Sequence, residues 1–159
     1  MNTRHDPLRN AAMHRVAIVV LLCLAVAAPA LAQNRRAVST DKAPKAIGPY
    51  SQAVIAGTTV YVSGQLGLDP STGAFVPGSI REQTEQALKN IGAVLEAAGC
   101  TMQSVVSCSV FLKDLNDFVA MNEVYAKHFR SDPPARATVE VARLPKDGLV
   151  EISCIAVLP

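Results

Sequence analysis

Histidine is scarce in this sequence, and the scarcity narrows the chemistry open to the chain. Three histidines occur in 159 residues, and two of them, His5 and His14, precede residue 33. The third, His128, has no second histidine with which to build a metal site. No cysteine has the neighbouring His and Asp that activate a nucleophile. The sequence therefore predicts no metal centre and no catalytic thiol.

The chain also lacks an excess of positive charge beyond its first segment. Of 15 basic and 13 acidic residues, three arginines and one aspartate precede residue 33, which leaves 12 of each sign. A neutral domain without a basic stripe lacks the electrostatic footprint of a protein that neutralises phosphates. We therefore expect no nucleic-acid partner.

Cysteine is too scarce, and odd in number, for a full disulfide framework. Beyond residue 32 the chain has Cys100, Cys108 and Cys154. The last two fall inside strand patterns, where a free cysteine usually behaves as a small buried hydrophobe. We expect that role for them.

The longest apolar run is too short to cross a membrane. It covers the 13 residues 16–28, whereas a spanning helix needs about 20. Three arginines precede it and Ala30-Leu31-Ala32 follows, the pattern of a secretory signal peptide over residues 1–32. A retained membrane anchor is the weaker alternative. We expect a periplasmic or secreted protein that begins at Gln33 and has no membrane contact after cleavage.

The 127 residues after position 32 suit one domain with one core. Residues 33–45 mix charge, alanine and proline without periodicity, which predicts a mobile lead-in to a domain over 46–159. Helical spacing predicts helices over 79–98 and 117–129. Ser79 and Glu82 form a capping-box pattern at the start of the first helix, and Gly99 follows its end.

Strand patterns occupy the remaining segments of this domain. They cover residues 51–55, 58–63, 105–112, 133–144 and 150–157. This order predicts an α+β fold, with a single mixed β-sheet and two helices packed on one of its faces. Val105 and Phe111 alternate with Val106, Val110 and Leu112, which puts apolar residues on both faces of that strand. We therefore expect self-association that buries the second face.

Arg136 stands at the mouth of a predicted strand, directly after a stiff segment. Pro133 and Pro134 restrict the backbone there, so the guanidinium fork can be held where a carboxylate meets it through two hydrogen bonds. A structural ion pair is the alternative, because most arginines beside strands are structural or solvated.

Four separate stretches resemble the motifs of the RidA-type reactive-intermediate deaminase family, in that family's order and spacing. The stretches read I-G-P-Y-S-Q-A at 47–53, V-S-G-Q at 62–65, V-F-L-K-D-L-N-D-F at 110–118, and P-A-R-A-T-V-E-V-A-R-L at 134–144 with V-E-I at 150–152. The match runs from about Thr40 to Val157. Four motifs in register are far more specific than any one of them.

The resemblance implies an assembly and a reaction. It implies a chorismate mutase-like homotrimer whose sheets meet in a central β-barrel, with ligand sites between subunits. The reaction is hydrolysis of reactive 2-imino or 2-enamino acids, such as 2-aminoacrylate, to 2-keto acids and ammonia, with neither metal nor organic cofactor. The partner is thus a small imino or keto acid. The residues that the resemblance places around it are Tyr50, Ser63, Gly64, Asn116, Arg136 and Thr138.

One departure from the family pattern concerns the attacking water. Members typically carry a glutamate two residues after that of the V-E-I triplet, and the resemblance implies that it positions or polarises this water. Here that position is Ser153, which can orient a water but cannot act as its base at neutral pH. Glu151 lies on the same strand face, about 6.6 Å away along the strand. Thr138 also replaces a frequent cysteine.

The sequence thus leaves three functions open. The first is an exported imine or enamine deaminase that uses Arg136 and Ser153. The second is a trimeric module that binds small carboxylates without catalysis. The third is a holdase-like interaction protein or a ribonuclease, and the neutral charge of the domain counts against the ribonuclease.

Overall fold

The longest helix, α2 (Ile80–Ala98), begins and ends where the sequence predicts. In the computed structural model, which describes residues 35–159, the backbone N–H of Ser79 donates to the Glu82 carboxylate at 2.7 Å. Gly99 ends the helix in the left-handed region, with φ at 88°. One face of the helix carries the largest buried side chains, among them Leu88, Ile91 and Leu95. The core therefore lies between this helix and a sheet.

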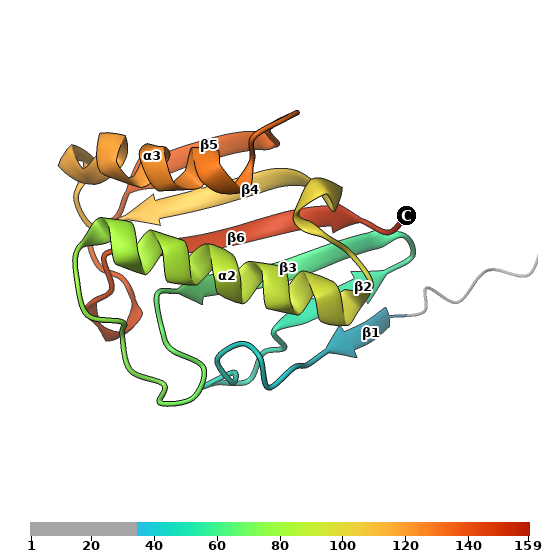
Figure 1. The fold of residues 1–159 in the computed structure, drawn as a ribbon. Coiled ribbons are helices and arrows are strands. Elements are labelled where there is room, and N and C mark those ends of the chain that lie inside the picture. Colours follow the sequence, from blue (N-terminus) through green and yellow to red (C-terminus); the bar gives the residue numbers. More distant parts are fainter. Residues whose placement is uncertain (1–34) are drawn as a thin grey trace, which may run out of the picture. The chain divides into compact units, whose positions relative to one another are not determined.

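That sheet has six strands in the order β1-β2-β3-β6-β4-β5 (Figure 1). The strands are β1 (Arg35–Val38), β2 (Ala53–Ala56), β3 (Thr59–Leu66), β4 (Val105–Leu112), β5 (Ala135–Glu140) and β6 (Val150–Val157). All neighbours pair antiparallel except β4 and β5, which are parallel. The prediction of a single mixed sheet is confirmed.

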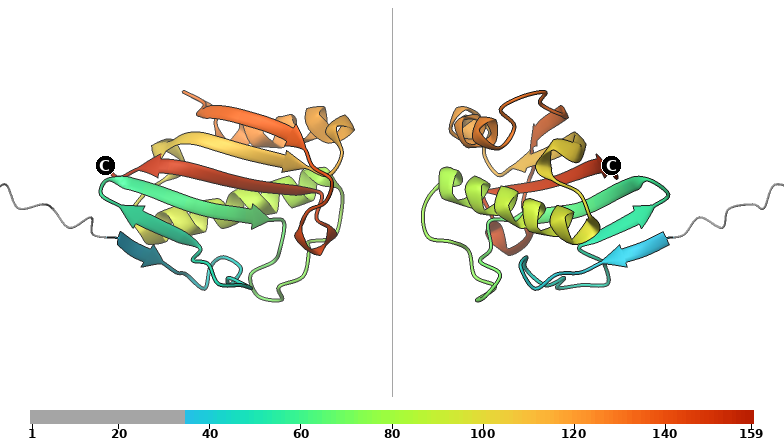
Figure 2. Two further views of the ribbon diagram at one scale, coloured as in Figure 1. Left: turned by 180° about the vertical axis from the view of Figure 1, so that it is seen from behind. Right: turned by 45° about the vertical axis from the view of Figure 1, so that its right-hand side comes forward.

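Both helices cover the same face of this sheet. The long helix α2 connects β3 to β4, and α3 (Phe118–His128) connects β4 to the parallel strand β5. The strands β3 and β4 are also parallel, since each is antiparallel to β6. A connection between parallel strands must cross the sheet, and here each of the two connections contains a helix that packs on it. Figure 2 shows α2 behind the sheet when the sheet is viewed from its other side, which no helix of residues 35–159 covers.

The uncovered face carries exposed apolar side chains. These are Tyr61, Val106, Val139, Ile155 and Val157, each between 37% and 50% exposed. The prediction that Val105 shares a face with Phe111 is wrong. A register shift in β4 places Val105 on the helix side, where it is buried. Exposed apolar residues thus remain on β3, β6, β4 and β5, with polar residues such as Ser109, Ser153 and Glu151 between them.

One other sequence prediction needs correction. Arg35–Val38, predicted as part of a mobile lead-in, is a strand that pairs with β2, and Val38 is buried. A four-residue edge strand has too short a pattern to show in the sequence. The last two strands, joined by a short turn, do not pair with each other, because β6 lies between β3 and β4.

The predicted signal peptide, residues 1–32, lies outside the described residues. Within residues 35–159, no helix combines the length and apolar character needed to span a membrane. Cys100, Cys108 and Cys154 are free and buried, as the strand patterns predicted for the last two.

Candidate functional site

Arg136 faces the helix side of the sheet, where aromatic rings surround it. Its neighbour across the parallel pair is the buried Cys108, so both side chains point toward α3. The guanidinium carbon lies 4.5 Å from the ring centroid of Tyr125 and 5.8 Å from that of Phe118. These two rings are seven residues apart and therefore lie on one face of α3.

No carboxylate of residues 35–159 pairs with this guanidinium. The ion pairs there belong to other residues, and none involves Arg136. The alternative of a structural ion pair therefore has no acidic partner in this part of the chain. Beside Arg136 is an open cavity of about 480 Å³, which Asn122, Pro133 and Pro134 also line. A half-buried cation beside a cavity, with no anion of its own, suits an anionic ligand.

A second set of candidate site residues lies around Gly64, near a register shift in β3. A Cβ atom on this residue would come within 1.8 Å of the Glu151 carboxylate, so any other residue here would force the Glu151 side chain to move. Burial raises the pKa of the Glu151 carboxyl above its usual range. Gly64 also borders a small pocket of about 30 Å³ with Tyr50 and Ile47.

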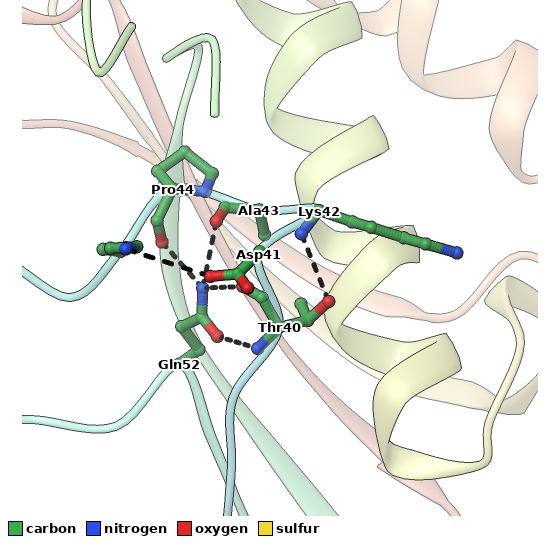
Figure 3. Close-up of polar contacts among 7 residues, drawn as sticks. Thr40, Asp41, Lys42, Ala43, Pro44 and Gln52 are labelled. Atoms are coloured by element: carbon green, nitrogen blue, oxygen red, sulfur yellow. Dashed lines mark hydrogen bonds and ion pairs between the residues drawn. The ribbon is translucent and has the colours of Figure 1, made fainter. Parts of the chain in front are cut away.

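Gln52 holds one wall of this pocket in place (Figure 3). Its buried side-chain amide donates to the carbonyls of Thr40, Ala43 and Pro44 at 3.0, 3.2 and 2.8 Å. The backbone N–H of Thr40 donates to Oε1 of Gln52 at 2.7 Å. These hydrogen bonds satisfy backbone groups of an irregular segment that has no strand partner, and they hold Pro44 at the pocket.

Asn90 on α2 holds the opposite wall. Its buried amide donates to the carbonyls of Leu66 and Leu68 at 3.0 and 2.9 Å, and both leucines line the pocket. Sequence reasoning missed Gln52 and Asn90 as architectural residues. The signal for Asn90 was available, because it is a polar residue inside the apolar stripe of α2.

The other predicted site residues near this pocket have distinct surroundings. The Ser63 hydroxyl donates to the Ser51 carbonyl at 2.6 Å, so it joins β3 to the segment before β2. Tyr50 is 49% exposed, and its hydroxyl accepts from the Ile47 N–H at 3.4 Å. Tyr50 therefore presents its ring to the outside of this chain.

Asn116 and Thr138 lie on the Arg136 side. Asn116 is exposed in a short 3-10 turn before α3, and this turn is attached to β5 by a hydrogen bond from the Leu115 N–H to Glu140 at 2.8 Å. Thr138 is two residues after Arg136 on the same face of β5. Its hydroxyl is buried and has no hydrogen-bond partner within residues 35–159.

The predicted residues thus form two groups that one chain does not bring together. Arg136, Thr138 and Asn116 lie at the β5 edge, whereas Gly64 and Glu151 lie on β3 and β6. Across the sheet, Gly64 on β3 is about 14 Å from β5, and Glu151 on β6 is about 10 Å from it. Arg136 also faces the helices, whereas Glu151 faces the uncovered side.

Ser153, the residue predicted to orient the attacking water, lies on β6. This residue pairs with Ser109 of β4, one alternate position beyond Glu151 on the same face. An acid already lies against Gly64, and it is the glutamate of the V-E-I triplet itself. The sequence alone could not show this approach of Glu151 to Gly64, because it depends on the register between strands that are far apart in the chain.

Comparisons with known proteins agree on one family. The family model described as Endoribonuclease L-PSP matches residues 40–158. A 2-iminobutanoate/2-iminopropanoate deaminase from Capra hircus is 58% identical over 123 residues, covering 77% of this chain and 90% of the relative.

Two solved structures are also similar. RidA from a Psychrobacter species is 50% identical, with a TM-score of 0.75 over 77% of this chain and 99% of its own. E. coli TdcF with bound serine is 42% identical, with a TM-score of 0.75 over 78% of this chain and 99% of its own.

Proposed function

We propose that this chain, which belongs to the Endoribonuclease L-PSP family, hydrolyses 2-imino and 2-enamino acids. This is the reaction of the reactive-intermediate deaminases, whose motifs the chain carries. The products are 2-keto acids and ammonia. The observation that carries this proposal is Arg136, a cation beside a cavity without an acidic partner in residues 35–159. The name of the Capra hircus relative suggests short substrates with three or four carbons.

The chemistry requires a carboxylate clamp and one group that can both give and take a proton. An imine carbon is already electrophilic, so positioning and electrostatics supply most of the acceleration. Arg136 binds the substrate carboxylate through two parallel hydrogen bonds. Glu151, whose pKa burial raises, protonates the imine nitrogen to the iminium.

The resulting Glu151 carboxylate then takes a proton from the attacking water. Its oxygen bonds to the former imine carbon and gives a tetrahedral carbinolamine. Glu151 then donates this proton to the nitrogen, the carbon–nitrogen bond breaks to release ammonia, and the hydroxyl proton returns to the Glu151 carboxylate as the 2-keto acid forms. Gly64 leaves room for this cycle by exposing backbone next to the carboxyl group.

A trimer would complete the site. The uncovered sheet face exposes apolar side chains, and Arg136 and Glu151 lie on different strands and opposite faces of the sheet, so one chain does not bring both to one small acid. We therefore place Arg136 of one subunit against Gly64 and Glu151 of the next, with the three sheets meeting in a barrel. This arrangement buries the apolar face and assembles the clamp beside the proton-transfer group.

Ile155→Asp should convert such a trimer into monomers and abolish deamination. Ile155 pairs with Tyr61 in the middle of the uncovered face, so a carboxylate there would be desolvated on assembly but tolerated in the monomer. Native mass spectrometry at micromolar concentration measures the change, and Glu96→Lys on the exposed face of α2 is the control. A stable monomer in the parent protein would contradict the assembly.

Export rests on the pattern of residues 1–32. We place the mature protein in the periplasm or outside the cell, where imino acids formed by oxidation of amino acids would reach it. N-terminal sequencing of protein from the envelope and culture fractions should give a start at or near Gln33. Full-length protein starting at Met1 in the cytoplasm would contradict export.

A binding module for small carboxylates is the second candidate, because E. coli TdcF holds serine in its solved structure. A coupled assay separates it from the enzyme. An amino-acid oxidase generates imines in situ, and keto-acid release is followed with and without the purified mature protein. Acceleration over the uncatalysed rate supports the deaminase, whereas binding of 2-oxobutanoate without acceleration of any imine would favour the module.

A further inference from the structure

Arg136 is held by an aromatic ring rather than by an acid, and this choice of support has a chemical consequence. A structural carboxylate would fix the guanidinium, but it would also occupy its N–H donors and neutralise its charge. A ring below the guanidinium plane stabilises the same cation through its π face and leaves the in-plane N–H donors unoccupied. The ring centroid of Tyr125, at 4.5 Å, is well within the range of this interaction.

We propose that Tyr125 is a positioning residue for substrate recognition: its ring holds Arg136 with the donor edge of the guanidinium directed to the cavity at β5. This inference rests on the proposed function, because it assigns the means by which that function recognises a carboxylate. The cavity is lined by both residues and by Asn122 and the two prolines before β5. Tyr125 therefore lies between the hydrophobic core and the ligand side of Arg136.

Tyr125 is rigid enough for this task. Its side chain is 5% exposed, and it belongs to the core that also contains Met121 and Phe129. The Phe129 ring packs against it with the centroids 4.6 Å apart and the planes tilted by 36°. Phe118, the other ring near Arg136, is 36% exposed and its centroid lies farther away, at 5.8 Å. The main support is therefore Tyr125.

The ring of Tyr125, and not its hydroxyl, carries the proposed role. The hydroxyl is buried and has no hydrogen-bond partner of good geometry within residues 35–159. Burial also raises the pKa of this phenol, so it stays neutral and adds no charge beside Arg136. A phenylalanine at this position would keep the face on which the guanidinium lies.

The experiment measures 2-oxobutanoate affinity by calorimetry on assembled, purified variants, with single-turnover rates at saturating substrate. Tyr125→Phe should keep the dissociation constant within about twofold of the parent. Tyr125→Leu should raise it about 5- to 30-fold, as expected for loss of a desolvated cation–π contact, with the saturated rate less affected. Phe129→Leu is the matched control, because it disturbs the same aromatic pair without removing the ring under Arg136.

Pentafluorophenylalanine at position 125 keeps the test decisive if Tyr125→Leu fails to assemble. Fluorination reverses the charge distribution of the ring with little change in its shape, so affinity should fall relative to Tyr125→Phe. A purely structural role would leave the affinity unchanged. Equal affinity in these two proteins, or equal loss in Tyr125→Leu and Phe129→Leu, would overturn the inference.

The same measurements separate this inference from the proposed function. A parent protein that binds 2-oxobutanoate, shows the expected dependence on the ring, and yet accelerates no imine would retain the positioning role and lose the deaminase. A parent that deaminates imines with no dependence on the ring would retain the deaminase and lose the positioning role. A parent that neither binds nor deaminates would overturn both.

Discussion

Arg136→Ala should weaken 2-oxobutanoate binding by about 30-fold to several thousand-fold and abolish deamination. The change removes a charge-assisted pair of hydrogen bonds, for which truncation costs about 2 to 5 kcal/mol in a partly desolvated site. Arg136 is half-buried, and no acid of residues 35–159 would be left unpaired by its loss. The expected loss therefore falls on ligand binding more than on folding.

Arg136→Lys should recover only part of the affinity, because an ammonium is a point charge and cannot form the two parallel hydrogen bonds. Arg143→Ala is the matched control. That arginine is exposed and pairs with Asp147 through Nε at 2.7 Å, so its removal should leave ligand affinity unchanged. Calorimetric titration of all three variants measures these effects. Unchanged binding in Arg136→Ala would make the arginine structural and remove the main support for the site.

Glu151→Gln should lower the single-turnover rate of deamination about 10²- to 10⁴-fold, the usual contribution of a general acid–base group. Affinity for 2-oxobutanoate should stay the same, because the amide, like the protonated carboxyl, places no charge beside the ligand carboxylate. The amide is close in shape to the carboxyl, so the close approach to Gly64 is preserved. Rapid-quench measurement of keto-acid formation at saturating substrate tests the rate.

Ser153→Ala is the informative comparison for Glu151. If the water is activated by the glutamate beside Gly64, loss of the serine hydroxyl should change the rate by no more than about threefold. A large loss in Ser153→Ala with a normal rate in Glu151→Gln would reverse the assignment and return the role to Ser153.

The pH dependence of stability gives an independent test of the environment of Glu151. Burial raises its pKa above the ordinary value of 4.5, so the folded protein binds this proton more readily than the unfolded chain. Its contribution to stability is then complete below the unfolded pKa and is lost as the pH rises through the folded pKa. Glu151→Gln should therefore be more favourable relative to the parent at pH 8 than at pH 4. Urea denaturation at both pH values measures it, and an opposite trend would contradict the burial of this group.

Local patterns were sufficient for the helices and for most strands. The start of α2 depends on Ser79 and Glu82, three residues apart, and its end on Gly99, so all the determining contacts lie within one turn of the chain. The strand β4 follows residues 105–112 as predicted, because period-two alternation is also a local property. The family and its reaction class likewise followed from short motifs in a fixed order.

The tertiary structure decided which of these pieces meet. The sequence by itself determined the capped helix, the alternating strands and the motif residues Arg136, Gly64 and Glu151. It could not show that β6 lies between β3 and β4, because pairing between distant strands depends on the packing of the whole sheet. For the same reason only the folded chain shows Glu151 against Gly64, and Arg136 on the ring of Tyr125.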